Sequence, residues 1–133
     1  MNPDLSWVLN DVLRVRGARH AILVSADGLL LAQSSDIERD DAETNAAAMS
    51  SMQSLSRAVA GFVGGGKGIW KQTLIEYDGG WIFLIAAGSG AYLAVSTAPD
   101  VDMEAMSFRM QQVVGALGKA MTTPPRQTAG SDL

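Results

Sequence analysis

The sequence contains no cysteine and a single histidine, His20. The absence of cysteine excludes disulfide bonds, thiol catalysis and thiolate metal sites. One histidine, at the start of an expected strand, argues against a histidine metal site and against a serine–histidine catalytic centre. The longest apolar run, residues 81–87, is far too short to span a bilayer, and no basic start precedes a long apolar run. We therefore expect neither a membrane-spanning helix nor a signal peptide.

Basic residues are fewer than acidic ones, with 10 Lys and Arg against 14 Asp and Glu and a net charge of −4. This balance argues against a nucleic-acid-binding surface and against docking on an anionic membrane. The length of 133 residues and the hydrophobic content of 47% suit one domain with one core. We expect a cytoplasmic domain over residues 1–121 and a disordered tail over residues 122–133, with membrane association only through partners.

Hydrophobic periodicity and turn residues predict elements in the order α-β-β-α-β-β-β-α. Asp-Gly pairs at 27–28 and 78–79 stand between apolar runs and are strong hairpin signals. We expect helices over residues 5–17 and 40–63, strands over 20–25, 29–34, 69–77, 81–87 and 91–97, and a last helix capped by Asp100.

This order predicts an α+β fold with one five-stranded antiparallel sheet. The long helix is expected to cover one face of the sheet, and the first and last helices the other. Residues 81–87 form the most apolar strand and are expected at the centre. Residues 69–77 mix polar and apolar groups on both faces, which suits a sheet edge.

The long helix carries two stripes at helical spacing, one apolar and one of small residues. The apolar stripe, which is expected to pack on the sheet, consists of Met49, Met52, Leu55, Val59 and Phe62. The small stripe consists of Ala47, Ser51, Ser54, Ala58 and Gly61. Small residues either let another backbone come close or simply fill solvent-facing positions. The last helix has a methionine-rich stripe expected to fill the core, formed by Met103, Met106, Met110, Val113, Val114, Leu117 and Met121.

Two segments resemble functional motifs, but neither predicts a site. The acidic residues between 36 and 43 could bind a divalent cation or act as acid and base, yet such a run more often solvates a loop and favours a helix N-terminus. Residues 61–67 match the first part of a phosphate-binding loop, but Gly68 replaces the required serine or threonine. The loop also leaves a helix and opens a strand, the reverse of the required context. We predict no catalytic, cofactor or metal residues.

The expected edge strand predicts a two-fold dimer. An exposed edge that carries large apolar residues is a liability, which pairing with a second copy removes. The long helices of the two copies would then lie side by side through their small stripes. The predicted dimer contacts are Ile69, Trp70, Gln72 and Leu74 on the strand, and Ala47, Ser51, Ser54 and Ala58 on the helix.

From about Leu5 to Met121 the chain resembles the Roadblock/dynein light chain family. The resemblance rests on the first strand pair HAILVSADGLLLAQS, the Ala- and Ser-rich helix after an acidic loop, the hairpin YDGGWIFLIAAG and the final amphipathic helix. It implies a profilin-like fold, a homodimer joined edge to edge, and a platform for a small Ras-like GTPase. Bacterial members resemble the gliding-motility GTPase activator, and this short acidic chain is most similar to single-domain actinobacterial members.

The resemblance implies a non-enzymatic regulator that modulates the nucleotide cycle of the GTPase. The alternative is a scaffold that links a sensor-kinase-like partner to the GTPase without affecting hydrolysis. A small hydrolase or nucleotide-binding enzyme would rest only on Lys67 and its glycines. Weak candidates for partner contacts are Arg57, Gln53 and Trp7, although Arg57 also fits a solvated helix position and Trp7 a half-buried edge.

Overall fold

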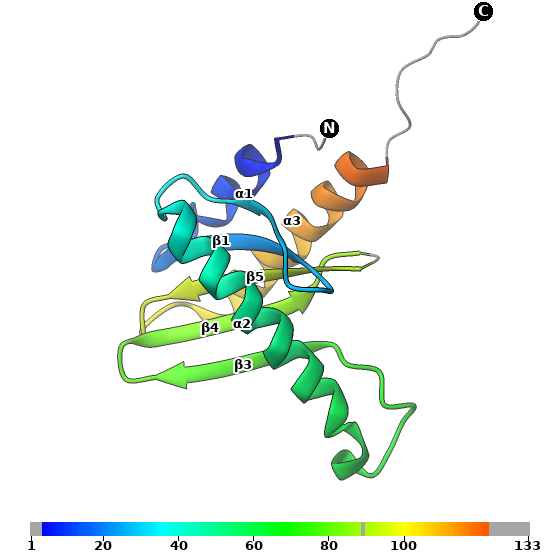
Figure 1. The fold of residues 1–133 in the computed structure, drawn as a ribbon. Coiled ribbons are helices and arrows are strands. Elements are labelled where there is room, and N and C mark those ends of the chain that lie inside the picture. The colour runs from blue at the N-terminus through cyan, green and yellow to red at the C-terminus, as the bar shows by residue number, and fades with distance from the viewer. Residues whose placement is uncertain (1–3, 89, 123–133) are drawn as a thin grey trace, which may run out of the picture.

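The structure, a computed structural model, describes residues 4–88 and 90–122. Its elements follow the predicted order α-β-β-α-β-β-β-α, with one additional 3-10 helix after the second α-helix (Figure 1). They are α1 Ser6–Val12, β1 Ala18–Ser25, β2 Leu30–Gln33, α2 Arg39–Ala58, η1 Ala60–Val63, β3 Gln72–Tyr77, β4 Gly80–Ala86, β5 Ala91–Thr97 and α3 Met103–Thr122. The predicted tail lies outside the described residues, except for Thr122 at the end of α3.

The strands form one antiparallel sheet in the order β2-β1-β5-β4-β3. The consecutive neighbours β3, β4 and β5 confirm the predicted meander, and β3 lies at the predicted edge. The expectation that β4 is the central strand was wrong, because β5 pairs with β1 and joins the first hairpin to the meander. β5 therefore occupies the centre.

The turn between β3 and β4 requires glycine at Gly80. The backbone there has a φ of 151°, which L side chains rarely adopt. A Cβ at this position would lie 1.8 Å from the carbonyl oxygen of Thr97 on β5, whereas a Cβ on neighbouring Gly79 would meet no atom within 4 Å. Gly80 thus lets the hairpin close tightly against β5.

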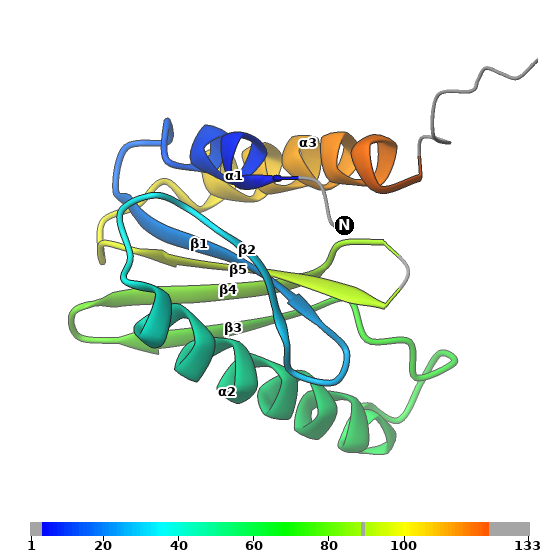
Figure 2. The same ribbon diagram turned by 45° about the horizontal axis from the view of Figure 1, so that its top comes forward.

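Helices cover both faces of the sheet as predicted: α1 and α3 lie on one side and α2 on the other (Figure 2). The layer under α1 and α3 is the larger and includes Leu9, Val12, Leu23, Phe83, Leu93, Met106, Met110 and Leu117. The layer under α2 is smaller and contains Ile22, Val24, Ala42, Ala46, Met49, Leu84 and Ala94. The predicted core stripe of α3 is confirmed for its buried members, while the side chain of Met121 lies outside the described residues.

On the side of α1 and α3, two helix ends differ from the prediction. α1 ends at Val12 rather than near Gly17, because the amides of Leu13 and Arg14 donate to carbonyl oxygens three residues back, which tightens the chain into turns. α3 is capped by Asp102 rather than Asp100. The Oδ1 atom of Asp102 accepts a hydrogen bond of 3.0 Å from the amide of Ala105, which satisfies a free N–H group of the first turn.

Candidate interaction surface

The helix α2 packs on the sheet mainly through its first four turns. Its buried residues are Ala42, Ala46, Met49 and Gln53. The two alanines let the helix backbone come close to the large sheet residues beneath it. The prediction of an apolar core stripe holds for Met49 and in part for Met52, which is half-buried. It was wrong for Leu55, Val59 and Phe62, whose exposed fractions are 68%, 62% and 95%.

Val59 and Phe62 are exposed because no strand lies beneath them. Leu55 precedes Ser56, which contacts Thr73 on β3, and it is exposed because it lies on the face of α2 turned away from the buried residues. The C-terminal end of α2 projects past β3, the last strand of the sheet (Figure 1). The α-helix also ends earlier than predicted, at Ala58, and η1 continues it to Val63. Gly64, in a left-handed conformation with a φ of 83°, then stops the helical path. Val59 and Phe62 therefore belong to an overhanging segment, and Leu55 to the outward face of α2 just before it, rather than to the core.

The neighbouring strand β3 has a free edge within the chain, because it pairs with β4 alone. Its outward N–H and C=O groups are available to another strand. Leu74 is 41% exposed on the face of α1 and α3, opposite Phe83 in the register, and those helices do not cover it. Tyr77 is exposed at the end of the strand. The edge is thus unpaired and carries exposed apolar side chains.

Trp70 connects the start of β3 to the overhanging helix. Its indole N–H donates to the Thr73 hydroxyl over 2.8 Å, and that hydroxyl in turn lies 2.7 Å from the hydroxyl of Ser56 on α2. The indole ring also meets Tyr92 edge to face, with centroids 5.7 Å apart. Trp70 was predicted to be a dimer contact on the strand, but it precedes β3 and turns toward α2, where it is half-buried.

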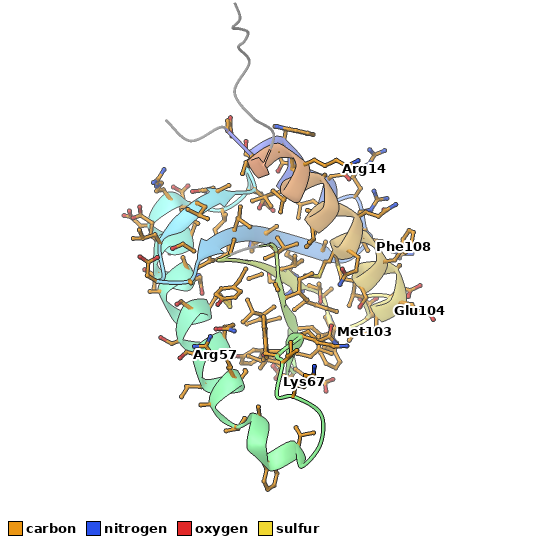
Figure 3. The ribbon with its side chains drawn as sticks, turned by 90° about the vertical axis from the view of Figure 1, so that its right-hand side faces the viewer. Arg14, Arg57, Lys67, Met103, Glu104 and Phe108 are labelled. Carbon is orange, nitrogen blue, oxygen red and sulfur yellow. The ribbon has the colours of Figure 1, made fainter. Side chains whose placement is uncertain are left out.

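A cleft of about 600 Å³ separates the end of α2 and η1 from the chain that leads into β3. Its lining is mainly apolar and backbone, and includes Val59, Val63, Gly66, Ile69 and Trp70. Lys67 and Lys71 line this cleft, whereas Arg57 on α2 does not. Figure 3 shows Lys67 in the glycine-rich loop and Arg57 on α2. The loop leaves a helix and opens a strand, as the sequence indicated, and Lys67 is exposed.

Most of the exposed large apolar side chains of the described chain gather on this side of the molecule. Seven of ten belong to it, and we call them the α2–β3 surface: Leu55, Val59, Phe62, Val63, Ile69, Leu74 and Tyr77. Such a concentration marks an interaction site, whereas single exposed apolar residues do not. On the long helix, periodicity could not distinguish the exposed residues Leu55, Val59 and Phe62 from core residues, since both recur at the same spacing.

The residues predicted to contact a second copy or a partner differ in exposure and in position. Ile69, Gln72 and Leu74 are exposed, as are the four small helix residues Ala47, Ser51, Ser54 and Ala58. Arg57 is exposed on α2, and Trp7 is 67% exposed on α1, far from this surface. Gln53 is only 5% exposed, because it lies on the face of α2 that packs on the sheet, so the structure does not offer it to a partner.

The acidic residues between 36 and 43 were the other possible site, for a metal ion or for acid–base catalysis. Within residues 4–88 and 90–122, no group of three or more His, Asp or Glu side chains is placed to hold a metal ion. The Nδ1 atom of His20 lies 3.3 Å from the Oδ2 atom of Asp36, and Arg39 pairs with Glu43 over 3.1 Å. None of the helices in the described part of the chain combines the length and the hydropathy needed to cross a bilayer.

The family model of the Roadblock/LC7 domain matches residues 6–97 of this chain. The crystal structure of a Roadblock/LC7 domain from Streptomyces avermitilis superposes with a TM-score of 0.83 at 30% sequence identity, over 91% of this chain and 100% of that one. A search of curated proteins found no match.

Two solved structures of lower sequence identity share the fold. MglB from Myxococcus xanthus superposes with a TM-score of 0.78 at 15% identity, over 90% of this chain and 96% of MglB. Profilin II from Acanthamoeba castellanii superposes with a TM-score of 0.56 at 13% identity, over 84% of this chain and 94% of the profilin. These likenesses confirm the expected profilin-like α+β fold. The match to the family model and the Streptomyces structure together show that the chain belongs to the Roadblock/LC7 domain family.

Proposed function

We propose that this chain is a non-enzymatic homodimeric platform that binds a small Ras-like GTPase and modulates its nucleotide cycle. The observation that carries the proposal is the α2–β3 surface, where a free strand edge and an overhanging apolar helix end lie side by side (Figure 1). A surface of this kind is unfavourable in an isolated protomer and is removed from water by a partner.

A second copy related by a two-fold axis fits both parts of this surface. Antiparallel pairing of β3 with its copy would satisfy the free edge and join the two sheets into one. The same rotation would bring the overhanging end of each α2 against the other protomer, where Leu55, Val59 and Phe62 would be covered by its helix and sheet. The exposed small residues Ser51 and Ser54 would then allow the two α2 helices to approach closely.

A GTPase partner is supported by the family and by the fold. Membership of the Roadblock family, as the resemblance implied, favours a GTPase platform, and MglB shares the fold. In the proposed dimer the outward faces of two α2 helices lie next to each other and present Arg57 twice. A guanidinium fork suits carboxylate or phosphate groups of a partner. We assign Arg57 to partner contact and the α2–β3 surface to dimerisation.

The experiment is a pull-down from the host's own lysate with the tagged full chain, in parallel with GDP and with a non-hydrolysable GTP analogue. Bound proteins are identified by mass spectrometry, and hydrolysis by the recovered GTPase is measured with and without the chain. Arg57→Ala serves as the contact variant, with the oligomeric state as its control. The regulator predicts preferential retention of a GTPase in one nucleotide state, a changed hydrolysis rate, and weaker retention by a still dimeric Arg57→Ala.

Other outcomes would contradict parts of this proposal. Equal retention in both nucleotide states with an unchanged hydrolysis rate would replace the regulator by a scaffold, which could also hold a sensor-kinase-like protein. Recovery of no GTPase under either condition would refute the proposed function. The proposed dimer would stand or fall separately, on the solution mass of the chain.

A further inference from the structure

A second feature lies under the first half of α2, away from the overhanging end. A cavity of about 190 Å³, partly open to solvent, lies between α2, the loop before it and the sheet. The cavity wall is mainly apolar and is formed by Ile22, Ile37, Met49, Ile82, Ala94 and Val95, with His20, Asn45 and Ser96 as its polar members. It is separate from the cleft beside η1, with which it shares no residue.

Two polar atoms of this cavity are buried without a hydrogen-bond partner in the described chain. They are Nδ1 of His20 and the hydroxyl oxygen of Ser96. Asp36 lies 3.3 Å from Nδ1 but is not aligned to form a hydrogen bond with it. Buried polar groups are nearly always paired, so two orphaned atoms in one cavity indicate a missing partner.

The sheet register explains why these atoms lie together. His20 on β1 is directly opposite Ser96 on β5, and Ser96 is in turn opposite Ile82 on β4. Side chains at directly opposed positions point to the same face and stand roughly 5 Å apart at their Cβ atoms. The pairing therefore brings an imidazole and a hydroxyl to one side of the cavity, and the apolar Ile82 next to them.

We propose that this cavity binds a small uncharged amphipathic molecule, about one aromatic ring in size and carrying one hydroxyl group. Cavities of about 150 Å³ accommodate benzene, so the volume suits a single ring. A ligand hydroxyl both donates and accepts, so it complements Ser96 and His20 in whichever tautomer the imidazole adopts. A carboxylate would bury its charge against an apolar wall and close to Asp36, which excludes acids.

The test uses phenol as the probe and toluene as its counterpart without the hydroxyl. Each is titrated into the isotope-labelled full chain, and the backbone amide signals are followed by NMR. We expect saturable phenol shifts confined to residues such as Ile22, Met49 and Ser96, and weaker binding of toluene. Ser96→Ala should weaken phenol binding about 2- to 10-fold, the range for one hydrogen bond, and leave toluene binding unchanged.

Two further variants make the result decisive. Ser107→Ala removes an exposed serine hydroxyl from α3, on the other face of the sheet, and should change nothing. Ala94→Leu fills the cavity and should abolish binding of both probes, with a melting curve to verify folding. Shifts that do not saturate, or that spread over the surface, would mean that the cavity holds water only and would overturn the proposal. Equal binding of phenol and toluene, unaffected by Ser96→Ala, would refute the assigned ligand class.

Discussion

Leu55→Arg is the substitution that tests the proposed dimer most sharply. Leu55 is 68% exposed in the protomer and lies on the outward face of α2, just before its overhanging end. Arginine forms helices about as readily as leucine, and exposed substitutions change stability by about 0.5 kcal/mol or less. The protomer should therefore fold normally, and any large effect must come from a surface that the protomer alone does not cover.

The size of the effect follows from the area still exposed. Burying a whole leucine side chain contributes about 1.5–3 kcal/mol, so the two thirds of Leu55 that remain exposed represent about 1–2 kcal/mol. A two-fold axis places the substitution in the interface twice, which gives about 2–4 kcal/mol. The dimer dissociation constant should rise about 30- to 700-fold, and burying two guanidinium groups would raise it further.

The assay is sedimentation velocity or size exclusion with light scattering, over a concentration series that spans the wild-type dissociation constant. Phe108→Arg is the matched control, because Phe108 is 67% exposed but lies on α3, across the sheet from α2 (Figure 3). We expect Leu55→Arg to be monomeric where the wild type and Phe108→Arg are dimeric. A dimer unaffected by Leu55→Arg, or weakened equally by both variants, would show that the α2–β3 surface is not the dimer interface.

Three further predictions concern the fold. Gly80→Ala should lower the free energy of unfolding by at least about 2 kcal/mol in denaturant titrations, because of the close Thr97 carbonyl, while Gly79→Ala changes it little. Met106→Ala should cost about 2–5 kcal/mol in the same assay, since Met106 is fully buried. Hydrogen bonds from the Ser6 amide and hydroxyl lower the pKa of Asp4 below its ordinary 3.8, so Asp4→Asn should destabilise the protein at neutral pH, and this difference should vanish as pH falls through the lowered pKa.

The order of elements along the chain and the layers could be predicted because each depends on local signals. Asp-Gly turns define the hairpins, and apolar periodicity defines the faces of α1 and α3. The centre of the sheet could not be predicted in the same way. The sequence shows that β3, β4 and β5 are consecutive, but the pairing of β5 with β1 joins segments some seventy residues apart, and no turn specifies it. The pairing of β5 with β1 depends instead on how the first hairpin and the meander pack together between the helices.

The polar pair His20 and Ser96 could not be predicted from the sequence for the same reason. Neither residue belongs to a motif, and a lone histidine at a strand start gave no reason to look for a partner. The two meet because β1 and β5 are adjacent in antiparallel register. A cavity forms above them because α2 packs on β1 and β2 and does not fill the space over Ile82. The site depends on the pairing register of two strands that are far apart in sequence, and the local sequence pattern does not show this register.

The overhang of α2 is different, because simple geometry could have revealed it. A helix predicted over residues 40–63 is about 36 Å long, at 1.5 Å per residue, and the 20 residues of α2 still span about 30 Å. Five strands about 4.8 Å apart give a sheet only about 19 Å wide. A helix that crosses the strands must then project beyond one edge, and it projects past β3 because its alanine-rich half packs over β1 and β2. The residues that pack on the sheet and most of the apolar stripe thus lie on different parts of one helix. Ala42 and Ala46 pack on the sheet, whereas Leu55, Val59 and Phe62 are left exposed for contact with a partner.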